Sequence, residues 1–215
     1  MSSLLLLLQK NNRCICSMPY SQFTLKSLVA DFNLNLEEKT QLFPNIQPIL
    51  PTELLSMTLQ ESLPLATAIN SEKARSEMII APILLEVKRK MNYKIALFSG
   101  SDFTVDTSLG LNGSPDFLIT RSSEQYYISA PVMSIVEAKN ENINLGLGQC
   151  GSEMLAAQIF NARENHQVDV IYGCVTTGVL WKFLRLEKQK LYIDPMEISI
   201  DPVERLLGIF MQILA

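Results

Sequence analysis

The sequence is poor in the residues that build several common kinds of catalytic site. His166 is the only histidine among 215 residues, so a histidine-based triad or a histidine-rich metal site is nearly excluded. The four cysteines are Cys14, Cys16, Cys150 and Cys174, and no second pair with zinc spacing follows the first pair. Isolated cysteines are usually small buried apolar residues, so we expect reduced thiols in a cytoplasmic protein.

A surplus of positive charge and a long apolar run are also missing. The formal net charge is −4, which argues against tight, sequence-independent binding of a duplex through many Lys and Arg contacts. A nuclease remains compatible with this charge, because the carboxylates of a metal site count as negative until the metal binds. The run of leucines at residues 4–8 lacks a basic flank and is too short for a signal sequence or a membrane span. We therefore expect no membrane association.

The sequence does contain enough apolar residues for a full core. It is 47% hydrophobic and 19% charged, which is typical of a globular protein. Apolar periodicity predicts a helix from Asn70 or Ser71 that Pro82 kinks or divides, followed by three strands, a helix and a further strand. Two more strands and a last helix after Pro202 complete the chain. This pattern alone indicates an α/β or α+β fold.

Two of the predicted core strands carry charged residues at one end. Asp116 heads the apolar run 117–119, and the apolar run 132–136 ends in Glu137, Ala138 and Lys139. Strand side chains alternate in direction, so Glu137 and Lys139 share one face and Ala138 points to the other. Charges at the end of a buried strand are costly unless they are compensated. A metal ion held by Asp116 and Glu137, with Lys139 beside it, would compensate them.

Pro115-Asp116, a hairpin's length of chain and then Glu137-x-Lys139 resemble the motif of the PD-(D/E)XK nuclease superfamily. The resemblance covers roughly residues 71–194, judged by the order of the predicted elements. It implies a restriction-endonuclease-like α/β core, in which helices flank a central mixed β-sheet in the order αβββαβ. Residues 71–215 would then form the nuclease core with a C-terminal helix, and residues 1–70 an N-terminal extension of irregular or helical chain.

Hydrolysis of nucleic-acid phosphodiesters, as an endonuclease or an exonuclease, is the activity that this resemblance implies. Hard divalent cations on oxygen ligands activate water and neutralise phosphate charge, so we expect Mg²⁺ or Mn²⁺ as cofactor. Asp116 and Glu137 are the candidate metal ligands, and by resemblance the Ala138 carbonyl is a further one. Lys139 would orient the attacking water or stabilise the phosphate charge. The alternative is a surface turn aspartate at 116 and a structural Glu-Lys strand end.

Three residues on the predicted helices are further candidates. Glu77 resembles the glutamate that the family often places on its first helix to bind or orient metal; the alternative is a solvent-facing residue. Gln149 resembles the catalytic-site glutamine that some branches carry on the helix after Glu-x-Lys. Those branches often have a tyrosine four residues on, where this chain has Glu153, one helical turn from Gln149. Glu153 either adds to the metal site or is exposed, and we favour Gln149.

Nucleic acid is the expected partner, with DNA ahead of RNA. Basic residues gather at 88–94 and again at 182–190, and either group could bind a backbone, although solvated faces are the commoner explanation. A second interpretation is a catalytically silent nuclease-fold module that acts in nucleic-acid binding or protein assembly, which the acidic net charge favours. A third is a component of a larger complex, or a homo-oligomer, docked through the apolar stripe of the C-terminal helix.

Overall fold

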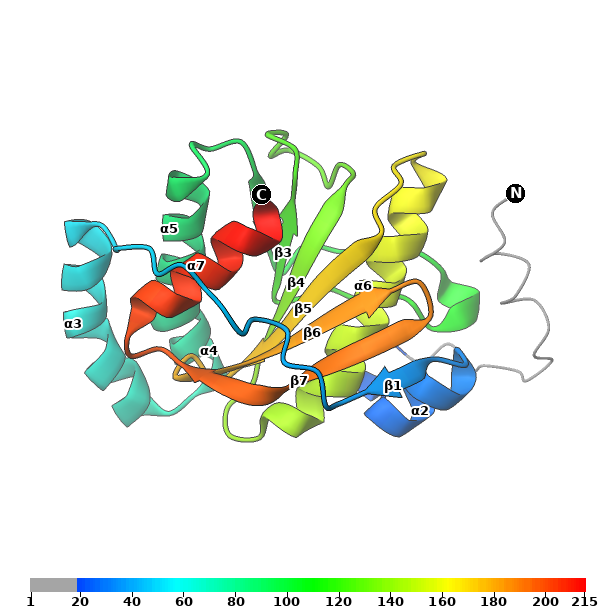
Figure 1. Cartoon of the computed structure of the whole chain (residues 1–215), viewed down its shortest axis with the longest axis horizontal. Helices are drawn as coiled ribbons and strands as arrows, with labels where there is room; N and C mark the ends of the chain where they lie inside the picture. Colours follow the sequence, from blue (N-terminus) through cyan, green and yellow to red (C-terminus); the bar gives the residue numbers. More distant parts are fainter. Residues whose placement is uncertain (1–18) are drawn as a thin grey trace.

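The structure is a computed structural model that describes residues 19–215. The leucine run, Cys14 and Cys16 lie outside the described residues. The chain forms a seven-stranded mixed sheet with helices on both faces, so the expected α/β class with a central mixed sheet flanked by helices is confirmed (Figure 1). No helix among residues 19–215 combines the length and the apolar character that crossing a membrane requires.

The sheet has the strand order β1-β7-β6-β5-β4-β3-β2. The strands are β1 (Asn35–Glu37), β2 (Ala96–Ser99), β3 (Phe117–Thr120), β4 (Val132–Ala138), β5 (Val170–Thr176), β6 (Leu180–Glu187) and β7 (Lys190–Ser199). The helices are α2 (Leu25–Asp31), α3 (Glu53–Ile69), α4 (Glu72–Arg75), α5 (Ala81–Lys90), α6 (Leu147–Arg163) and α7 (Val203–Leu214). A π-helical segment, η2 (Ser76–Ile80), joins α4 to α5, and the 3-10 turns are η1 (Tyr20–Gln22), η3 (Thr107–Leu109) and η4 (Ile143–Gly146).

Strand direction brings several strand ends to one end of the sheet. β4 and β5 are parallel neighbours, whereas β3 runs antiparallel to both β2 and β4. Phe117, the first residue of β3, pairs with Ser99 at the end of β2 and with Val136 near the end of β4. The residue that precedes β3 therefore lies beside the last residues of β4.

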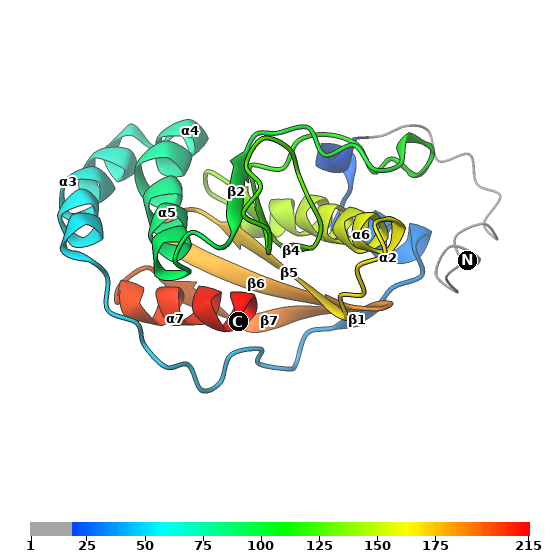
Figure 2. The ribbon, with the colours of Figure 1, turned by 90° about the horizontal axis from the view of Figure 1, so that it is seen from above.

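Apolar side chains form a core on each face of the sheet. α2 and α6 cover one face, where Leu28 is among the fully buried residues. α5 and α7 cover the other face, where Phe210 of α7 packs edge-on against Trp181 of β6, and α3 packs outside α5 (Figure 2). Burying side chains of this size contributes about 1.5–3 kcal/mol each. Cys150 and Cys174 are buried free thiols, so the predicted role of these two cysteines as core residues is confirmed.

The apolar stripe of α7 belongs to this second core. Its buried members include Leu206, Leu207, Phe210, Ile213 and Leu214. Packing within one chain therefore accounts for the stripe that suggested a docking helix. Self-association stays a prediction, and the apolar stripe of α7 no longer supports it.

Residues 19–70 are joined to the rest of the described chain through a strand, a helix and a side-chain hydrogen bond. β1 extends the sheet in parallel with β7, and α2 packs closely on α6. A Cβ on Gly151 of α6 would come within 2.4 Å of Leu28 Cδ2, so the glycine permits this close approach. The Leu42 N–H also donates to the buried Asp194 carboxylate at 2.9 Å. The division of the chain at residue 70 stays a prediction. Residues 19–70 nevertheless supply β1, the edge strand beside β7.

The helix predicted from Asn70 or Ser71 changes its winding before Pro82. Ser71 Oγ accepts a hydrogen bond from the Ala74 N–H and caps α4. The π-helical segment η2 follows, and α5 then begins with Pro82 in its first turn. Because proline lacks an N–H and its ring crowds the preceding turn, a wider turn ahead of it relieves the conflict.

Two segments differ from the predicted strands. The aromatic and β-branched residues Tyr126, Tyr127 and Ile128 predict a strand that begins at Tyr126, but β4 begins at Val132. The residues before Val132 form a loop that turns around the edge of β2. The sequence also predicts that residues 103–106 resume the strand before Gly100, but they make only an isolated bridge from Asp106 to Leu111. Aromatic and β-branched residues favour strands, but this preference yields to the packing context.

Candidate functional site

The candidate site lies where β3 begins and β4 ends. Asp116, the residue before β3, accepts a hydrogen bond through Oδ2 from the Ala138 backbone N–H at 2.7 Å. The Asp116 backbone N–H in turn donates to Oε1 of Glu137 at 3.3 Å. Antiparallel pairing of Phe117 with Val136 sets the register that places Asp116 opposite the end of β4.

Lys139 extends from the same strand end toward Glu137. Its Nζ lies 3.4 Å from Oε2 of Glu137. Gly146 leaves room for the lysine side chain, because a Cβ there would lie only 3.1 Å from Cε of Lys139. Burial acts to lower the pKa of Lys139, but the negative charges of Glu137, Glu72 and Asp116 outweigh it and the pKa is raised. Lys139 is therefore a fully protonated ammonium in this site.

Helix α6 closes the site from one face of the sheet. Gln149 Nε2 donates to Oε2 of Glu137 at 2.7 Å and to Oε1 of Glu153 at 3.2 Å. The spacing of one helical turn lets both α6 side chains reach the same end of β4. Glu153 is fully buried, and its Oε2 finds no donor among residues 19–215. The prediction that Gln149 and Glu153 share a face is confirmed, and Glu153 is not an exposed residue.

Burial and mutual repulsion raise the pKa of two carboxyls here. Burial raises the pKa of Glu153 well above its usual range, and the negative charge of Glu137 adds to the rise. Burial also raises the pKa of Glu137 to about 7; Asp116 adds to this shift, while the hydrogen bond with Glu153 and the charge of Lys139 oppose it. Both shifts favour the neutral form of these buried carboxyls, and the shift is larger for Glu153. Two buried carboxyls so close together titrate as a pair, because each negative charge disfavours the other.

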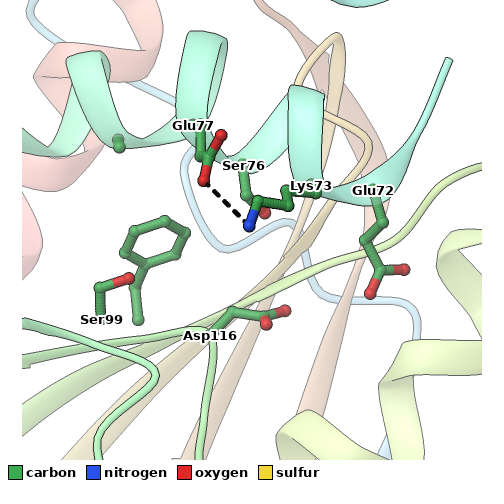
Figure 3. Close-up of a pocket in the computed structure, with 8 residues that line it drawn as sticks. Glu72, Lys73, Ser76, Glu77, Ser99 and Asp116 are labelled. Carbon is green, nitrogen blue, oxygen red and sulfur yellow. Dashed lines mark ion pairs between the residues drawn. The ribbon is translucent and has the colours of Figure 1, made fainter. Parts of the chain in front are cut away.

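A cleft with a volume of about 450 Å³ opens beside Asp116. The lining residues come from α4 and η2 on one side and from the strand ends on the other: Glu72, Lys73, Ser76, Glu77, Ala81, Ser99, Asp116 and Phe117. Figure 3 shows Asp116 on the sheet side of the cleft, facing the helical wall that carries Glu72 and Lys73. The cleft gives Asp116 an open approach from solvent, whereas Glu137 lies behind it and is buried.

The donor set can be compared with the needs of a divalent cation. Asp116 and Glu137 offer the carboxylate oxygens that Mg²⁺ and Mn²⁺ prefer, and Ala138 adds a backbone carbonyl next to them. Within the described part of the chain, no three His, Cys, Asp or Glu side chains are grouped so that they could hold a metal ion. Mg²⁺ commonly takes one or two carboxylates and completes its shell with water and phosphate oxygens. A site of two carboxylates therefore fits this ion by donor type.

The structure brings most of the predicted site residues together. Asp116, Glu137, Lys139 and Gln149 are linked by hydrogen bonds or an ion pair, and Ala138 takes part through its backbone. The prediction that Glu137 and Lys139 share a face is confirmed, because both meet residues of the α6 side. Their catalytic and metal-binding roles stay predictions.

Glu77 lies outside this network. Its side chain is 61% exposed and pairs with Lys73 at 3.6 Å on the wall of the cleft (Figure 3). Its metal-binding role stays a prediction. Glu72 is the acidic residue of this wall whose charge raises the pKa of Lys139, and sequence reasoning did not single it out. The only signal was its place directly after the Ser71 cap, which fixes Glu72 in the first helical turn.

A scan against protein-family models, a search of curated proteins and a search of solved structures each found no match to this chain. The chemistry of the site is therefore inferred from its own residues. These are three carboxyl groups, an ammonium and an amide that gather around the end of β4.

Proposed function

We propose that the protein is a divalent-metal-dependent nuclease that hydrolyses phosphodiester bonds in nucleic acid, with DNA ahead of RNA as substrate. The observation that carries this proposal is the contact of Asp116, Glu137 and Lys139 beside an open cleft. These residues lie at the start of β3 and at the end of β4. A Pro-Asp and a Glu-x-Lys sequence that occurred by chance would not be expected to lie in contact. Their arrangement supports the resemblance to the PD-(D/E)XK nuclease superfamily.

The order of elements supports a restriction-endonuclease-like core. The helical segment formed by α4, η2 and α5 precedes β2, β3 and β4, and α6 then leads to β5. β4 carries the Glu-x-Lys sequence, and α6 sets Gln149 against it. This is the αβββαβ order that the resemblance implies, with the remaining strands and helices added around it.

Asp116 and Glu137 would hold Mg²⁺ or Mn²⁺ through their carboxylates, with the Ala138 carbonyl as a further ligand. Bound there, such an ion would make a water more acidic and would neutralise negative charge on the phosphate. Lys139 keeps an ammonium where charge develops on the phosphate or where the attacking water is oriented. Gln149 holds the Glu137 carboxylate by its 2.7 Å hydrogen bond to Oε2, which leaves Oε1 turned toward Asp116.

Cleavage assays with Mg²⁺, Mn²⁺ or EDTA on single-stranded and duplex DNA and RNA test the proposal. Glu137→Gln keeps the shape of the side chain and removes its charge, so we expect cleavage to fall by about 10²–10³-fold. Glu197→Gln, which changes an exposed glutamate of β7, is the matched control and should cut like the wild type. Absence of cleavage with either metal, or full cleavage by Glu137→Gln, would contradict the proposal.

A catalytically silent nuclease-fold module is the second candidate, and the burial of the acidic pair favours it. Glu137 is 1% exposed and Glu153 is fully buried. The contacts of Glu137 with Asp116, Gln149 and Lys139 form a closed network that a binding or assembly module could retain for stability alone. Calorimetric titration with Mn²⁺ separates the two candidates. A divalent site that disappears in Glu137→Gln supports the nuclease, and the lack of any such site supports the module.

A further inference from the structure

The exposed aromatic side chains of residues 19–215 all lie at the end of the sheet opposite to the candidate site. Tyr93, Tyr126 and Tyr127 are 61%, 98% and 64% exposed, and the other aromatic side chains of this part of the chain are buried or partly buried. Tyr93 follows α5, and the other two lie in the loop between β3 and β4. β4 runs from this loop to Glu137, and its seven residues separate the two ends by roughly 20 Å at about 3.3 Å per residue.

The loop between β3 and β4 is tied to the edge of the sheet and to α5. Gln125 Nε2 donates to the Leu97 carbonyl of β2 at 2.8 Å, and the Lys88 ammonium of α5 donates to Oε1 of Gln125. Because β2 is an edge strand, the Gln125 amide takes a place that a neighbouring strand would otherwise occupy. Tyr126 and Tyr127 directly follow this anchor, so their backbone is held in place while their rings face solvent.

Three cations lie around the tyrosines. Pairing of Ala96 with Thr120 places Lys94, just before β2, beside Arg121, just after β3. Lys88 reaches the same loop through Gln125. Within residues 19–215, none of the three cations forms a salt bridge with a carboxylate. The same loop also carries Glu124, whose carboxylate accepts a hydrogen bond from the Tyr126 N–H at 2.8 Å, so three cations without a carboxylate partner stand against one acidic residue of the loop.

We propose that this end of the molecule binds single-stranded nucleic acid. The binding surface, called the tyrosine surface, consists of Tyr93, Tyr126, Tyr127, Lys88, Lys94 and Arg121. Exposed rings offer stacking platforms to unpaired bases, and the cations lie where the phosphates of the same strand would run. A duplex hides the faces of its bases and depends on more phosphate contacts than three cations provide. The proposal does not rest on cleavage at the acidic end.

An anionic membrane surface is the main competing occupant, because tyrosine and lysine also suit that environment. Interfacial binding to a membrane scales with the apolar area that enters the lipid. In the loop between β3 and β4, the exposed large apolar side chains are Tyr126 and Tyr127, and no exposed aliphatic side chain accompanies them. The loop therefore fits stacked bases better than lipid chains.

Fluorescence anisotropy with a labelled oligothymidine of about 20 nucleotides, in EDTA to prevent metal-dependent cleavage, tests the proposal on the full chain. The double substitution Tyr126→Ser, Tyr127→Ser should weaken binding by about tenfold or more, because two stacking platforms are lost. The double substitution Lys94→Gln, Arg121→Gln should weaken binding as well. It should also flatten the slope of log affinity against log salt by about 0.7 for each lost phosphate contact.

Two controls make the test specific. Tyr126→Phe with Tyr127→Phe keeps both rings and should bind like the wild type, and Lys26→Gln removes an exposed lysine of α2 and should also leave binding unchanged. The melting temperature of each variant checks that it folds. The proposal is overturned if the wild type does not bind oligothymidine, if the serine variant binds equally well, or if phosphatidylserine vesicles bind in its place. Failure of the proposed nuclease would show only in cleavage with metal, so the two outcomes are distinguishable.

Discussion

The two ends of the sheet differ in the burial and the pairing of their charged side chains. At the carboxyl end of β4, Glu137 and Glu153 are buried; Glu137 pairs with the Lys139 ammonium, and the Gln149 amide donates to both carboxyls. At the other end, the cations of the tyrosine surface are at or near the surface and have no carboxylate partner in the described part of the chain. Buried charge requires partners that are fixed in place, whereas exposed charge stays available to an external polyanion. This contrast is the basis for placing the proposed hydrolysis at one end and the proposed binding of single strands at the other.

One turn of helix α5 carries both cations that are paired with a carboxylate and a cation that is not. Arg89 and Lys90 pair with the buried Glu86, while Lys88 turns to the loop and keeps its charge free of a carboxylate. Glu86 also accepts hydrogen bonds from the N–H and hydroxyl of Thr52, which caps α3. The basic run 88–90 is therefore divided between fold stability and the tyrosine surface.

The largest effect is expected when a variant of the acidic end and a variant of the tyrosine surface are compared in the same cleavage and binding assays. Lys139→Ala should lower cleavage by roughly 10²-fold or more, because a charge aimed at the phosphate is lost. It should leave metal-free binding of oligothymidine unchanged, since Lys139 lies about 20 Å from the tyrosine surface along β4. Tyr126→Ser with Tyr127→Ser should do the reverse and raise KM while kcat is retained. Cleavage rates at saturating substrate and anisotropy in EDTA measure both quantities. Equal losses of binding in the two variants would mean that the ends form a single site.

A smaller effect is expected at Glu86, where Glu86→Gln should destabilise the fold by about 2 kcal/mol. The amide leaves Arg89 and Lys90 without a counter-charge and weakens the hydrogen bonds from Thr52. Two freed cations near the tyrosine surface should at the same time tighten oligothymidine binding. Urea unfolding measures the first effect and anisotropy the second, with the exposed Glu61→Gln as the control.

The destabilisation by Glu86→Gln should depend on pH in one direction. Burial acts to raise the pKa of Glu86, but hydrogen bonds from Thr52 and Arg89 lower it below its usual value. A carboxyl with a depressed folded pKa stabilises the protein above its unfolded pKa, and this contribution is lost as the pH falls through the folded value. The difference between wild type and variant should be full at neutral pH and shrink below about pH 4.3, the usual pKa of glutamate. A difference that grows on acidification would contradict the role of the ionised carboxylate.

Sequence periodicity correctly predicted which site residues share a face of the same strand or the same helix. Strand alternation placed Glu137 and Lys139 on one face, and helical spacing placed Glu153 with Gln149. The contact between Asp116 and Ala138 needed the register of β3 against β4, which tertiary pairing sets.

The direction or burial of other side chains depends on tertiary contacts, which a short stretch of sequence does not reveal. The π-helical turn before Pro82 shifts the phase of the helix, so the direction of Glu77 did not follow from ordinary helical spacing. Tyr126 and Tyr127 have the composition of a strand, but the Gln125 side chain fixes them in a loop at the sheet edge. The apolar stripe of α7 was predicted correctly as a helix face, while its burial inside the chain depends on the whole second core.

The smallest expected effect is a gain in stability from Glu153→Gln. The carboxyl is fully buried, and burial together with the charge of Glu137 raises its pKa well above the usual range. A carboxyl with a raised folded pKa destabilises the protein as the pH rises above its unfolded value, since the folded state must then retain the proton. The amide that replaces the carboxyl could donate to Glu137 without that requirement, so Glu153→Gln should raise the free energy of unfolding by about 1 kcal/mol at neutral pH. Urea unfolding with the exposed Glu141→Gln as control measures this difference. Loss of stability in Glu153→Gln would show that the acidic end depends on the carboxyl itself, and the contrast between a closed acidic end and an open basic end would then need a different physical basis.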